Sequence, residues 1–468
     1  MASGLSFGTC GTSTSKERIS SFEIPAPALH TLRTLEAAGY ESWMVGGFVR
    51  DSLRGAIPQD IDIASTAKWQ DASRILREAG FSVHETGTKH GTITAVFDRT
   101  PIEITTLRTE GNYSDRRHPD SVHFIDRIED DLARRDFTIN ALAYHPDRGL
   151  LDPFDGKGDL DEKRIRCVGE PRVRFSEDAL RILRGLRFAS QLGFDLEKDT
   201  EEATFAQAEL LEEIAGERIR VEMEKLLCGS AVHDVLMRYV DVLGVVIPEL
   251  LPMKGLDQRT RYHVYDVLEH SAYVIQNAPA YPLVRWAAFF HDMGKPDSFS
   301  LDDQGRGHMY GHPEVSAAHL GNVAKRLRFP NRLTHRIDLL VRYHDLRPAN
   351  TPKSIRKLYA KLDYDESLFH AMCDLMRADA LSQAPLCEER VHLTDDLEAT
   401  FNTMIADEQC FSLDDLDVSG RDIIALGVKQ GPAIGKVLDI LLEAVIDEKI
   451  KPDRASLLSY AESVIGSD

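Results

Sequence analysis

Short segments in the first third of the chain alternate apolar and polar side chains, at residues 93–97, 102–106 and 122–125. Alternation sends successive side chains to opposite faces of a strand, so these segments are predicted β-strands. The segment 72–79 instead has the spacing of an amphipathic helix. This mixture predicts an α/β module over residues 25–150.

Beyond residue 175 nearly all of the periodicity is helical, as in residues 179–186 and 221–227. The segment 151–156, Leu-Asp-Pro-Phe-Asp-Gly, is a turn-rich junction because proline and glycine interrupt helices. We therefore predict an α+β protein in which an α/β head precedes an all-α neck and a helical body. The predicted parts are 1–24 (flexible leader), 25–150 (catalytic head), 151–240 (neck), 241–385 (helical body domain) and 386–468 (helical tail).

The composition indicates a chain of several domains without a membrane span. A length of 468 residues is typical of two to four domains, and no apolar run approaches the roughly 20 residues that cross a bilayer. The first residues are rich in Ser, Thr and Gly and lack the apolar core of a secretory signal. Six scattered cysteines without a CxxC pair predict a reducing cytoplasm and no structural zinc.

The net charge of −20 argues against a nucleic-acid partner if it is taken as an average. Residues 325–357, however, contain ten basic side chains and only two acidic ones, and a second basic stretch with interleaved acids covers 157–187. Either stretch alone is consistent with a solvated helix face. Together they favour an RNA-facing surface, for which the candidates are Lys325, Arg326, Arg328, Arg332 and Arg336.

Candidate catalytic chemistry begins with Asp60-Ile61-Asp62. In a strand, the two carboxylates share one face, and such a pair suits hard cations such as Mg²⁺. Glu103 lies in a second alternating segment and is the candidate third carboxylate. Three carboxylates on neighbouring strands can hold two metal ions. The alternative is a surface strand that happens to carry two aspartates.

A double glycine upstream lowers the weight of that alternative. The predicted strand 43–45 ends at Gly46-Gly47, and a short helix that contains Arg50 follows and ends before Gly55. Glycines at such a turn can expose backbone N–H groups to phosphate oxygens. This pattern predicts a nucleotide-binding turn beside the carboxylates.

The segment 131–140 adds candidate nucleotide ligands. Arg135 offers donors for triphosphate oxygens, Asp136 can accept from a ribose hydroxyl, and Asn140 lies one predicted helical turn beyond Asp136. Capping and ion pairing at a helix start is the alternative explanation.

The segment 177–184 has the spacing of a base-reading helix. Asp178 and Arg181 share a predicted helix face with Arg184 beside them, and Glu177 can hold the Arg181 guanidinium through an i,i+4 pair. An acceptor beside fixed donors matches cytosine and adenine, and mismatches uracil and guanine. The alternative is an ordinary surface ion pair, worth about 0.3–0.5 kcal/mol.

Six motifs occur in a fixed order along the chain: Gly46-Gly47-x-Val49-Arg50-Asp51, Asp60-x-Asp62, Glu103 with Thr105-Thr106-Leu107-Arg108, Arg134-Arg135-Asp136-Phe137-Thr138-x-Asn140-Ala141, Asp152-Pro153-x-Asp155-Gly156 and Glu177-Asp178-x-x-Arg181. They resemble the class II tRNA nucleotidyltransferase and bacterial poly(A) polymerase family, whose heads are polymerase-β-like, over residues 28–230. The resemblance implies that Asp60 and Asp62 bind the catalytic metals and that Arg135 and Asp136 position the nucleotide. It also implies that Asp178 and Arg181 form a protein template for CTP and ATP, while 152–156 flexes between C and A addition.

A second candidate metal site lies in residues 263–380. His270, His291-Asp292 and Asp379 resemble the ligand set of HD-domain phosphohydrolases, and His344 fits an additional ligand. His263, His312 and His319 are equally consistent with ordinary polar residues. The predicted 241–385 domain is therefore an HD-type domain with a second divalent metal. It either hydrolyses a phosphate ester or serves as a scaffold for RNA.

The leading functional hypothesis is a template-independent tRNA nucleotidyltransferase that uses Mg²⁺, CTP and ATP to build all or part of the CCA end of tRNA. Poly(A) polymerase is the close alternative, although this chain has no basic extension for tracking RNA. An HD phosphohydrolase with an inactive head is the alternative from another class. A noncatalytic RNA-binding scaffold would need neither carboxylate cluster.

Overall fold

The computed structural model describes residues 23–58, 60–88, 91–110, 122–407, 413–447 and 449–465. Residues 1–22 of the predicted leader, together with Cys10 and Cys410, lie outside these ranges. The chain divides into two compact units, Met1–Glu170 and Pro171–Asp468. The five predicted parts are finer than these units, and their boundaries stay predictions.

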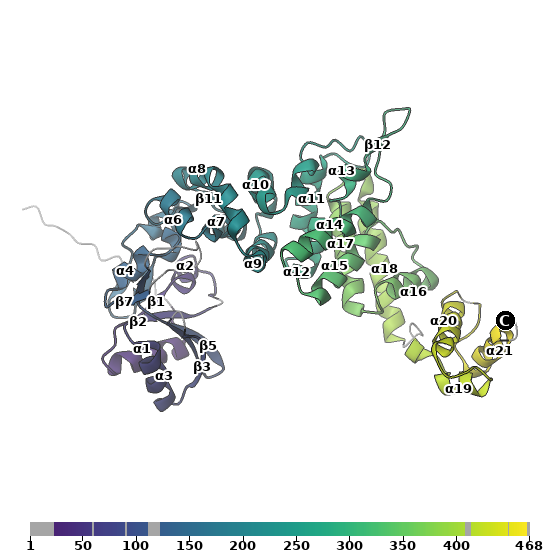
Figure 1. The fold of residues 1–468 in the computed structure, drawn as a ribbon, viewed down its shortest axis with the longest axis horizontal. Coiled ribbons are helices and arrows are strands. Elements are labelled where there is room, and N and C mark those ends of the chain that lie inside the picture. The colour runs from purple at the N-terminus through teal and green to yellow at the C-terminus, as the bar shows by residue number, and fades with distance from the viewer. Residues whose placement is uncertain are drawn as a thin grey trace, which may run out of the picture. The chain divides into compact units, whose positions relative to one another are not determined.

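A seven-stranded sheet forms the centre of the first unit, in the order β3-β4-β5-β2-β1-β8-β9 (Figure 1). Its strands are β1 (Ser42–Val45), β2 (Asp62–Ser65), β3 (Ser82–Gly87), β4 (Thr92–Phe97), β5 (Thr100–Thr106), β8 (Ala143–His145) and β9 (Gly149–Leu151). Strand β2 pairs in parallel with β5, whereas the other pairings are antiparallel. The predicted strands at 93–97 and 102–106 are confirmed.

Helices cover both faces of this sheet. Helices α1 (Ala26–Ala37) and α3 (Trp69–Glu78) contact each other and the strands, and an apolar cluster that includes Val45, Ala64 and Leu132 packs α4 (Ile128–Ala133) against β1 and β2. All four residues of β1 are buried, as expected for a central strand that is covered on both faces. The remaining elements are α2 (Gly47–Leu53), β6 (Arg108–Glu110), β7 (Val122–Phe124), the 3₁₀ turn η2 (Thr138–Asn140), α5 (Gly156–Asp161) and β10 (Arg164–Ile165).

The second unit is almost entirely helical among its described residues, as the periodicity predicts (Figure 1). Its first helices are α6 (Pro171–Glu177), α7 (Leu180–Leu192), α8 (Lys198–Ala206), α9 (Gly216–Leu227) and α10 (Val232–Val246). The body consists of α11 (Val267–Asn277), α12 (Pro282–Phe290), α13 (Lys295–Ser298), α14 (His312–Arg326), α15 (Asn331–Tyr343), α16 (Pro352–Lys361), α17 (Glu366–Leu381) and α18 (Glu389–Ala406). The final helices are α19 (Gly420–Ala425), α20 (Pro432–Ile446) and α21 (Arg454–Ile465).

Short elements connect these helices: β11 (Asp195–Leu196), β12 (Ser300–Leu301), β13 (Gly307–His308), and the 3₁₀ helices η3 (Ala208–Glu213), η4 (Pro248–Met253), η5 (Pro385–Cys387) and η6 (Leu413–Asp415). No helix in the described ranges is long and apolar enough to cross a membrane.

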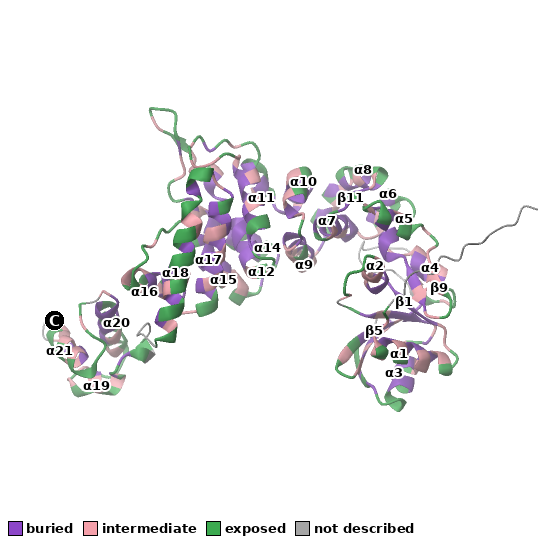
Figure 2. Ribbon diagram, turned by 180° about the vertical axis from the view of Figure 1, so that it is seen from behind, coloured by how far each residue is buried: buried purple, intermediate pink, exposed green. Residues whose placement is uncertain are grey.

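The second unit contains aromatic packing in the body and a separate apolar cluster near its end. Trp286 is fully buried on α12 and contacts the rings of Phe290 and Phe329. Leu441 and Leu457 belong to the other cluster, which holds α19, α20 and α21 together. Buried residues follow the inner faces of the body helices and exposed residues the outer faces (Figure 2). This is the pattern that amphipathic helices produce.

Helices α7 and α9 pack closely at one glycine. Gly229 follows α9, and the neighbouring Ala231 N–H donates to the Ser190 carbonyl oxygen at 2.9 Å. A Cβ at Gly229 would lie 2.1 Å from Ser190 Oγ and 2.5 Å from the Ser190 carbonyl carbon. Gly229 therefore permits the approach of the helices that carry Arg181 and Arg218.

We expect Gly229→Ala to lower the free energy of unfolding of the second unit by about 1–3 kcal/mol, the usual cost of overpacking. Gly321→Ala is the matched control, because a Cβ at this position on α14 meets nothing within 4 Å. The control should be neutral or stabilise by up to about 1 kcal/mol. Urea denaturation followed by circular dichroism measures both, and equal midpoints for the two variants would contradict the packing argument.

Candidate active site

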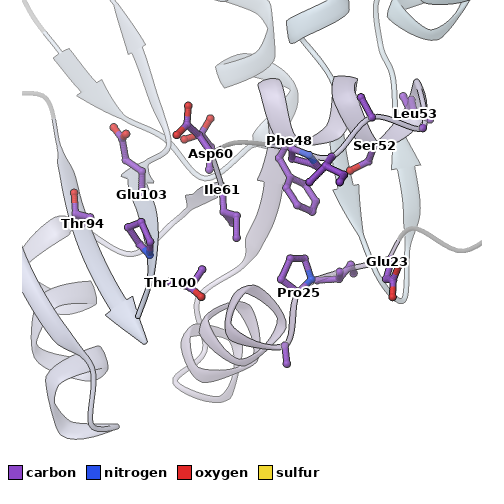
Figure 3. A pocket seen from close by; sticks show the side chains of 18 residues that line it. Glu23, Pro25, Phe48, Ser52, Leu53, Asp60, Ile61, Thr94, Thr100 and Glu103 are labelled. Carbon is purple, nitrogen blue, oxygen red and sulfur yellow. The ribbon is translucent and has the colours of Figure 1, made fainter. Parts of the chain in front are cut away.

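Three carboxylates meet at the edge of strands β2 and β5. The parallel register places Asp62 opposite Glu103. The alternation predicts that Asp60 and Asp62 both lie within a strand. Strand β2 instead begins at Asp62, and Asp60 lies in the bend that precedes it. Asp60 and Glu103 nevertheless point to the same side, whereas Ile61 points the other way (Figure 3). All three carboxylates line a cavity of about 1160 Å³.

The carboxylates oppose one another's ionisation. Burial and the neighbouring Glu103 charge raise the pKa of Asp62 to about 6, although Arg135 and Arg50 act in the opposite direction. Burial and the Asp60 charge also raise the pKa of Glu103. A hard cation bound between these oxygens would relieve the repulsion, so the donor set fits a divalent metal.

The glycine turn brings an arginine to this edge. Gly46 has a φ of +65°, and a Cβ there would lie 3.0 Å from Arg135 Nη1 and 3.6 Å from Asp62 Oδ2. A side chain would therefore strain the backbone and displace the guanidinium. Gly47 starts α2, as predicted. A glycine is therefore required at position 46, because Arg135 and Asp62 both approach the backbone there.

The other predicted nucleotide ligands form a hydrogen-bonded chain behind Arg135. Arg50 Nη1 donates to Asn140 Oδ1 at 2.8 Å, and Asn140 Nδ2 donates to Asp136 Oδ1 at 3.2 Å. Arg135 Nη1 donates to the Asn140 carbonyl oxygen at 3.3 Å. The predicted helical turn between Asp136 and Asn140 is the 3₁₀ turn η2, which begins only at Thr138. The predicted nucleotide ligands therefore lie in one network, in which Arg50 donates to Asn140 and Asp51.

Asp131 fixes this arrangement and was not among the predicted site residues. Its side chain is buried; Oδ1 accepts from Arg134 Nη2 at 2.7 Å, and Oδ2 accepts from Arg135 Nη2 at 3.3 Å. Burial opposes its ionisation, but the two guanidinium groups outweigh burial and lower the pKa of Asp131. Only the adjacency of Asp131 to Arg134 and Arg135 within one helical turn could have indicated this role.

The predicted base-reading residues lie in the second unit, at a break between two helices. Helix α6 ends at Glu177 and α7 begins at Leu180, so the single helix predicted over 177–184 is wrong. The break arises where Asp178 Oδ1 accepts from the Leu180 N–H at 3.1 Å, in the manner of a helix cap.

Both template candidates are held rigidly by neighbours. Arg181 Nη1 donates to Glu177 Oε2 at 2.5 Å, so the predicted i,i+4 pair is present, and it also donates to the Arg174 carbonyl oxygen. Asp178 Oδ2 accepts from Arg218 Nη2 at 2.8 Å. Arg184 is half-buried and lies 3.9 Å from Glu222 Oε1. This partner, Arg218 on α9, was not among the predicted site residues.

Histidines and aspartates from five helical segments meet in the body of the second unit. The predicted residues His270, His291, Asp292, His344 and Asp379 come together there, and His312 joins them. His312 Nε2 lies 3.3 Å from Asp292 Oδ1, which favours a place among the candidate ligands over the alternative of an ordinary polar residue. His319 instead pairs with Asp297 at the surface, while burial and the Lys295 charge lower the pKa of His263 to about 3.

The four clustered imidazoles are oriented alike. Each places Nδ1 within 2.7–3.1 Å of a backbone carbonyl oxygen, of Ser382, Ala288, Met309 and Val341 respectively for His270, His291, His312 and His344. Donation from Nδ1 turns the Nε2 atom of each ring toward Asp292, which is the usual arrangement of metal-ligating histidines. Burial disfavours charge, yet hydrogen bonds to Asp292 and Asp379 raise the pKa of His270 to about 9, so the cluster favours a positive charge at its centre.

The predicted RNA-facing residues are more neutralised than their sequence suggests. Arg326 pairs with Glu249 at 2.7 Å, Arg328 with Glu217 at 3.6 Å and Arg336 with Asp365 at 3.5 Å. Lys325 and Arg332 are exposed. These acidic partners lie outside residues 325–357, so a count of charges within that stretch does not include them. RNA binding by the five residues stays a prediction.

The sheet order, the paired carboxylates and the Arg135 network define a polymerase-β-like nucleotidyltransferase head. Family models match three stretches of the chain: the "Poly A polymerase head domain" at 42–166, the "Probable RNA and SrmB- binding site of polymerase A" at 193–253, and "tRNA nucleotidyltransferase domain 2" at 313–461. A CCA-adding enzyme of Leuconostoc mesenteroides is 33% identical over 449 residues, covering 93% of this chain and 95% of the relative. The chain belongs to the class II CCA-adding enzyme and poly(A) polymerase family.

Other relatives agree with this assignment. A CCA-adding enzyme of Geobacillus thermodenitrificans is 46% identical over 209 residues, which cover 45% of this chain and 51% of that protein. The crystal structure of the Bacillus stearothermophilus CCA-adding enzyme in complex with CTP has a TM-score of 0.68 at 26% identity, covering 95% of this chain and 99% of that one. The Thermotoga maritima CCA-adding enzyme complexed with tRNA shares the fold, with a TM-score of 0.54 at 20% identity over 94% of this chain and 96% of that one.

We expect Asp131→Asn to lower the free energy of unfolding of the first unit by about 2–4 kcal/mol, because it removes the charge that two guanidinium groups share. Since the pKa of Asp131 is lower in the folded state, its contribution is full above the unfolded pKa of about 3.9 and is lost as the pH falls further. The wild type should therefore lose more stability than the variant between pH 5 and 3 in urea titrations. Exposed Asp130→Asn is the control, and the same acid slope in wild type and Asp131→Asn would contradict the role of Asp131.

Proposed function

We propose that this chain is a template-independent tRNA nucleotidyltransferase that adds C and A to the 3′ end of tRNA, using CTP and ATP and releasing pyrophosphate. The observation that carries the proposal is the register of Asp62 opposite Glu103, with Arg135 approaching Asp62 across the Gly46 turn. Full-length relatives named as CCA-adding enzymes support it.

The reaction requires positioning more than covalent chemistry. The 3′-hydroxyl oxygen of the RNA bonds to the α-phosphorus of the nucleotide while the bond from that phosphorus to the β-phosphate bridging oxygen breaks, and the hydroxyl proton passes to solvent. Arg135 is held beside the carboxylates by Asp131 and donates to triphosphate oxygens. Asp136, oriented by Asn140, accepts from the ribose.

Members of this family use divalent metal. For this chain we propose Mg²⁺, held by Asp60 and Asp62 with Glu103 as the third carboxylate. When bound, the ion lowers the charge density on the triphosphate and on the attacking oxygen. Protonation of Asp62 competes with such an ion below about pH 6, because the pKa of Asp62 is raised to about 6 in its absence.

Selection of C and A is assigned to Asp178 and Arg181. Cytosine and adenine each present an amino donor next to a ring-nitrogen acceptor. Arg218 and Glu177 hold the carboxylate and the guanidinium in place, so the pair is preorganised for that pattern. Recognition of CTP, ATP and the tRNA end by this unit, and a cytoplasmic location, stay predictions.

A second site is favoured by the histidine cluster. We assign one divalent metal ion to His270, His291, Asp292 and Asp379, with His344 as an additional ligand, as in an HD-type domain, and phosphohydrolase activity as a second function. The Nδ1 contacts to backbone carbonyl oxygens support this assignment.

Purified protein should incorporate CMP into tRNA that lacks CCA and AMP into tRNA that ends in CC, in the presence of Mg²⁺. Generic RNA should receive at most a few nucleotides. Asp60→Ala should reduce incorporation by at least about 10³-fold, a loss typical of removing a main electrostatic group in the transition state. Gel analysis with labelled CTP and ATP measures all three.

Exposed Asp98→Ala, on the turn between β4 and β5, is the control and should retain full incorporation. Long A tracts on generic RNA would identify a poly(A) polymerase instead. Incorporation that survives Asp60→Ala would contradict the assignment of the metal site.

Asp178→Ala should lower kcat/KM for CTP by about 10–100-fold, the value of a hydrogen bond to a charged group. Its effect on the slow use of UTP should be smaller, because UTP does not present the amino donor. The CTP-to-UTP ratio therefore falls. Glu202→Ala, which breaks a surface pair on α8, should leave the ratio unchanged. An unchanged ratio in Asp178→Ala would remove Asp178 from base selection.

A further inference from the structure

A row of polar side chains crosses four strands of the head sheet, starting at the candidate carboxylates. The register places Asp62 opposite Glu103 and Glu103 opposite Thr94. Thr94 in turn lies opposite His84 on β3. Paired residues on neighbouring strands share one face of the sheet, so the row runs across β2, β5, β4 and β3 in the order of the sheet. Thr94 and Glu103 point to the same side, where Asp60 also lies (Figure 3).

The face that carries this row is accessible over β3, β4 and β5. Thr94 is half-buried, and Glu103 and His84 are exposed. Helix α3 contacts these three strands from the opposite face, where Ser73 donates to Glu85, the neighbour of His84 in β3. The side chains of β4 and β5 that point to that opposite face are fully buried: Ile93, Ala95, Ile102 and Ile104. Among the described residues, the face of the row therefore stays open beside the carboxylates.

The position of Arg135 indicates the side from which an RNA end approaches. Arg135 Nη1 and Asp62 Oδ2 both lie beside Gly46, which follows β1, and β1 is the neighbour of β2 on the side away from β5. Since Arg135 is the proposed ligand of the triphosphate, the pyrophosphate leaves toward β1. The attacking and leaving oxygens of phosphoryl transfer lie roughly in line. The attacking 3′-hydroxyl therefore arrives from the side of β5 and β4.

We propose that Thr94 binds the 2′-hydroxyl of the 3′-terminal nucleotide of the RNA and makes the head selective for an acceptor that ends in ribose. The inference rests on the nucleotidyltransferase function proposed above and extends it to the acceptor. The 2′-oxygen is bonded to the carbon next to the one that carries the attacking 3′-oxygen. With the 3′-oxygen held at the carboxylates, Thr94 lies one strand further in the direction from which the RNA arrives.

The spacing of the strands matches this geometry. Directly opposed residues of an antiparallel pair have Cβ atoms about 4.5–5.5 Å apart. The Thr94 hydroxyl can therefore reach a group that is bound beside Glu103. The lining of the cavity of about 1160 Å³ includes Asp60, Asp62, Glu103 and Thr94. A single ribose in this cavity can contact the carboxylates and the threonine at the same time.

Thr94 differs from the nearby threonines in its hydrogen bonds. Thr92 and Thr105 pair with each other, and their Oγ1 atoms are 3.0 Å apart. Thr94 Oγ1 has no such partner among the described residues. A hydroxyl group can both donate and accept, so it complements a 2′-hydroxyl, the group by which proteins distinguish RNA from DNA.

A comparison of two acceptors tests the proposal. Single-turnover CMP incorporation is measured on tRNA that lacks CCA, with either a ribose or a 2′-deoxyribose at its 3′-terminal nucleotide. Thr94→Val keeps the shape of the side chain and removes the hydroxyl. We expect this variant to lose about 2–10-fold in rate on the ribose-ended acceptor, the value of one hydrogen bond between neutral groups. Its rate on the deoxy-ended acceptor should equal that of the wild type, so the preference for ribose falls by the same factor.

Thr100→Val is the matched control. Thr100 lines the same cavity and lies on the same strand as Glu103, but its side chain points to the other side (Figure 3). This variant should keep the wild-type preference for ribose. Thermal melting of both variants reports on folding. The concentration of CTP that gives half of the maximal rate should stay unchanged in Thr94→Val, because the acceptor and not the nucleotide loses a contact.

Equal losses on the two acceptors in Thr94→Val would overturn the proposal, because they would leave Thr94 with a structural role alone. An unchanged rate on the ribose-ended acceptor would also overturn it. Failure of the wild type to incorporate CMP on either acceptor would instead contradict the transferase function on which the inference rests.

Discussion

The parallel pairing of β2 with β5 places the Asp62 carboxylate beside Glu103, and the surrounding residues of the head offset the resulting repulsion. Backbone register alone imposes this proximity, because paired residues on neighbouring strands share a face. Burial raises the electrostatic cost, and the elevated pKa of Asp62 reflects it. Arg135 partly balances the charge, and the proposed metal ion would offset the remaining excess.

Arg135 can play this part because three separate features hold it. Gly46 has no side chain, so the guanidinium approaches the turn. The buried Asp131 carboxylate accepts from it, and the Asn140 backbone accepts on the other side. The same Asn140 orients Asp136. These hydrogen bonds fix donors and acceptors in place beside the negatively charged carboxylates. Phosphoryl transfer requires this kind of preorganisation.

The histidine cluster of the second unit uses the same principle with different ligands. Backbone carbonyl oxygens fix the orientation of four imidazoles, so their Nε2 atoms converge on Asp292. In both units, charged or polar groups that lie close together form a donor set that would suit a cation. Each site is therefore a local cost in stability, which a ligand that binds there would reduce.

The strands of the head, the glycine turn and the group of carboxylates could be predicted from the sequence, because apolar alternation and turn-forming residues are local signals. It also indicated most of the histidine cluster, because the His291-Asp292 motif is distinctive. It assigned no role to Asp131 or Arg218 and left His312 open, because their positions depend on contacts with Arg135, Asp178 and Asp292. The break at Asp178 does not show in the sequence because the apolar spacing continues across it. The net positive charge of the basic stretch was overestimated because its partners Glu249, Glu217 and Asp365 are distant in sequence.

The central claim, that Glu103 opposite Asp62 is a catalytic carboxylate, is tested most directly by single-turnover CMP incorporation with Glu103→Gln in saturating Mg²⁺. We predict a large fall in the rate, together with greater stability of the metal-free variant, and an unchanged rate would contradict the account.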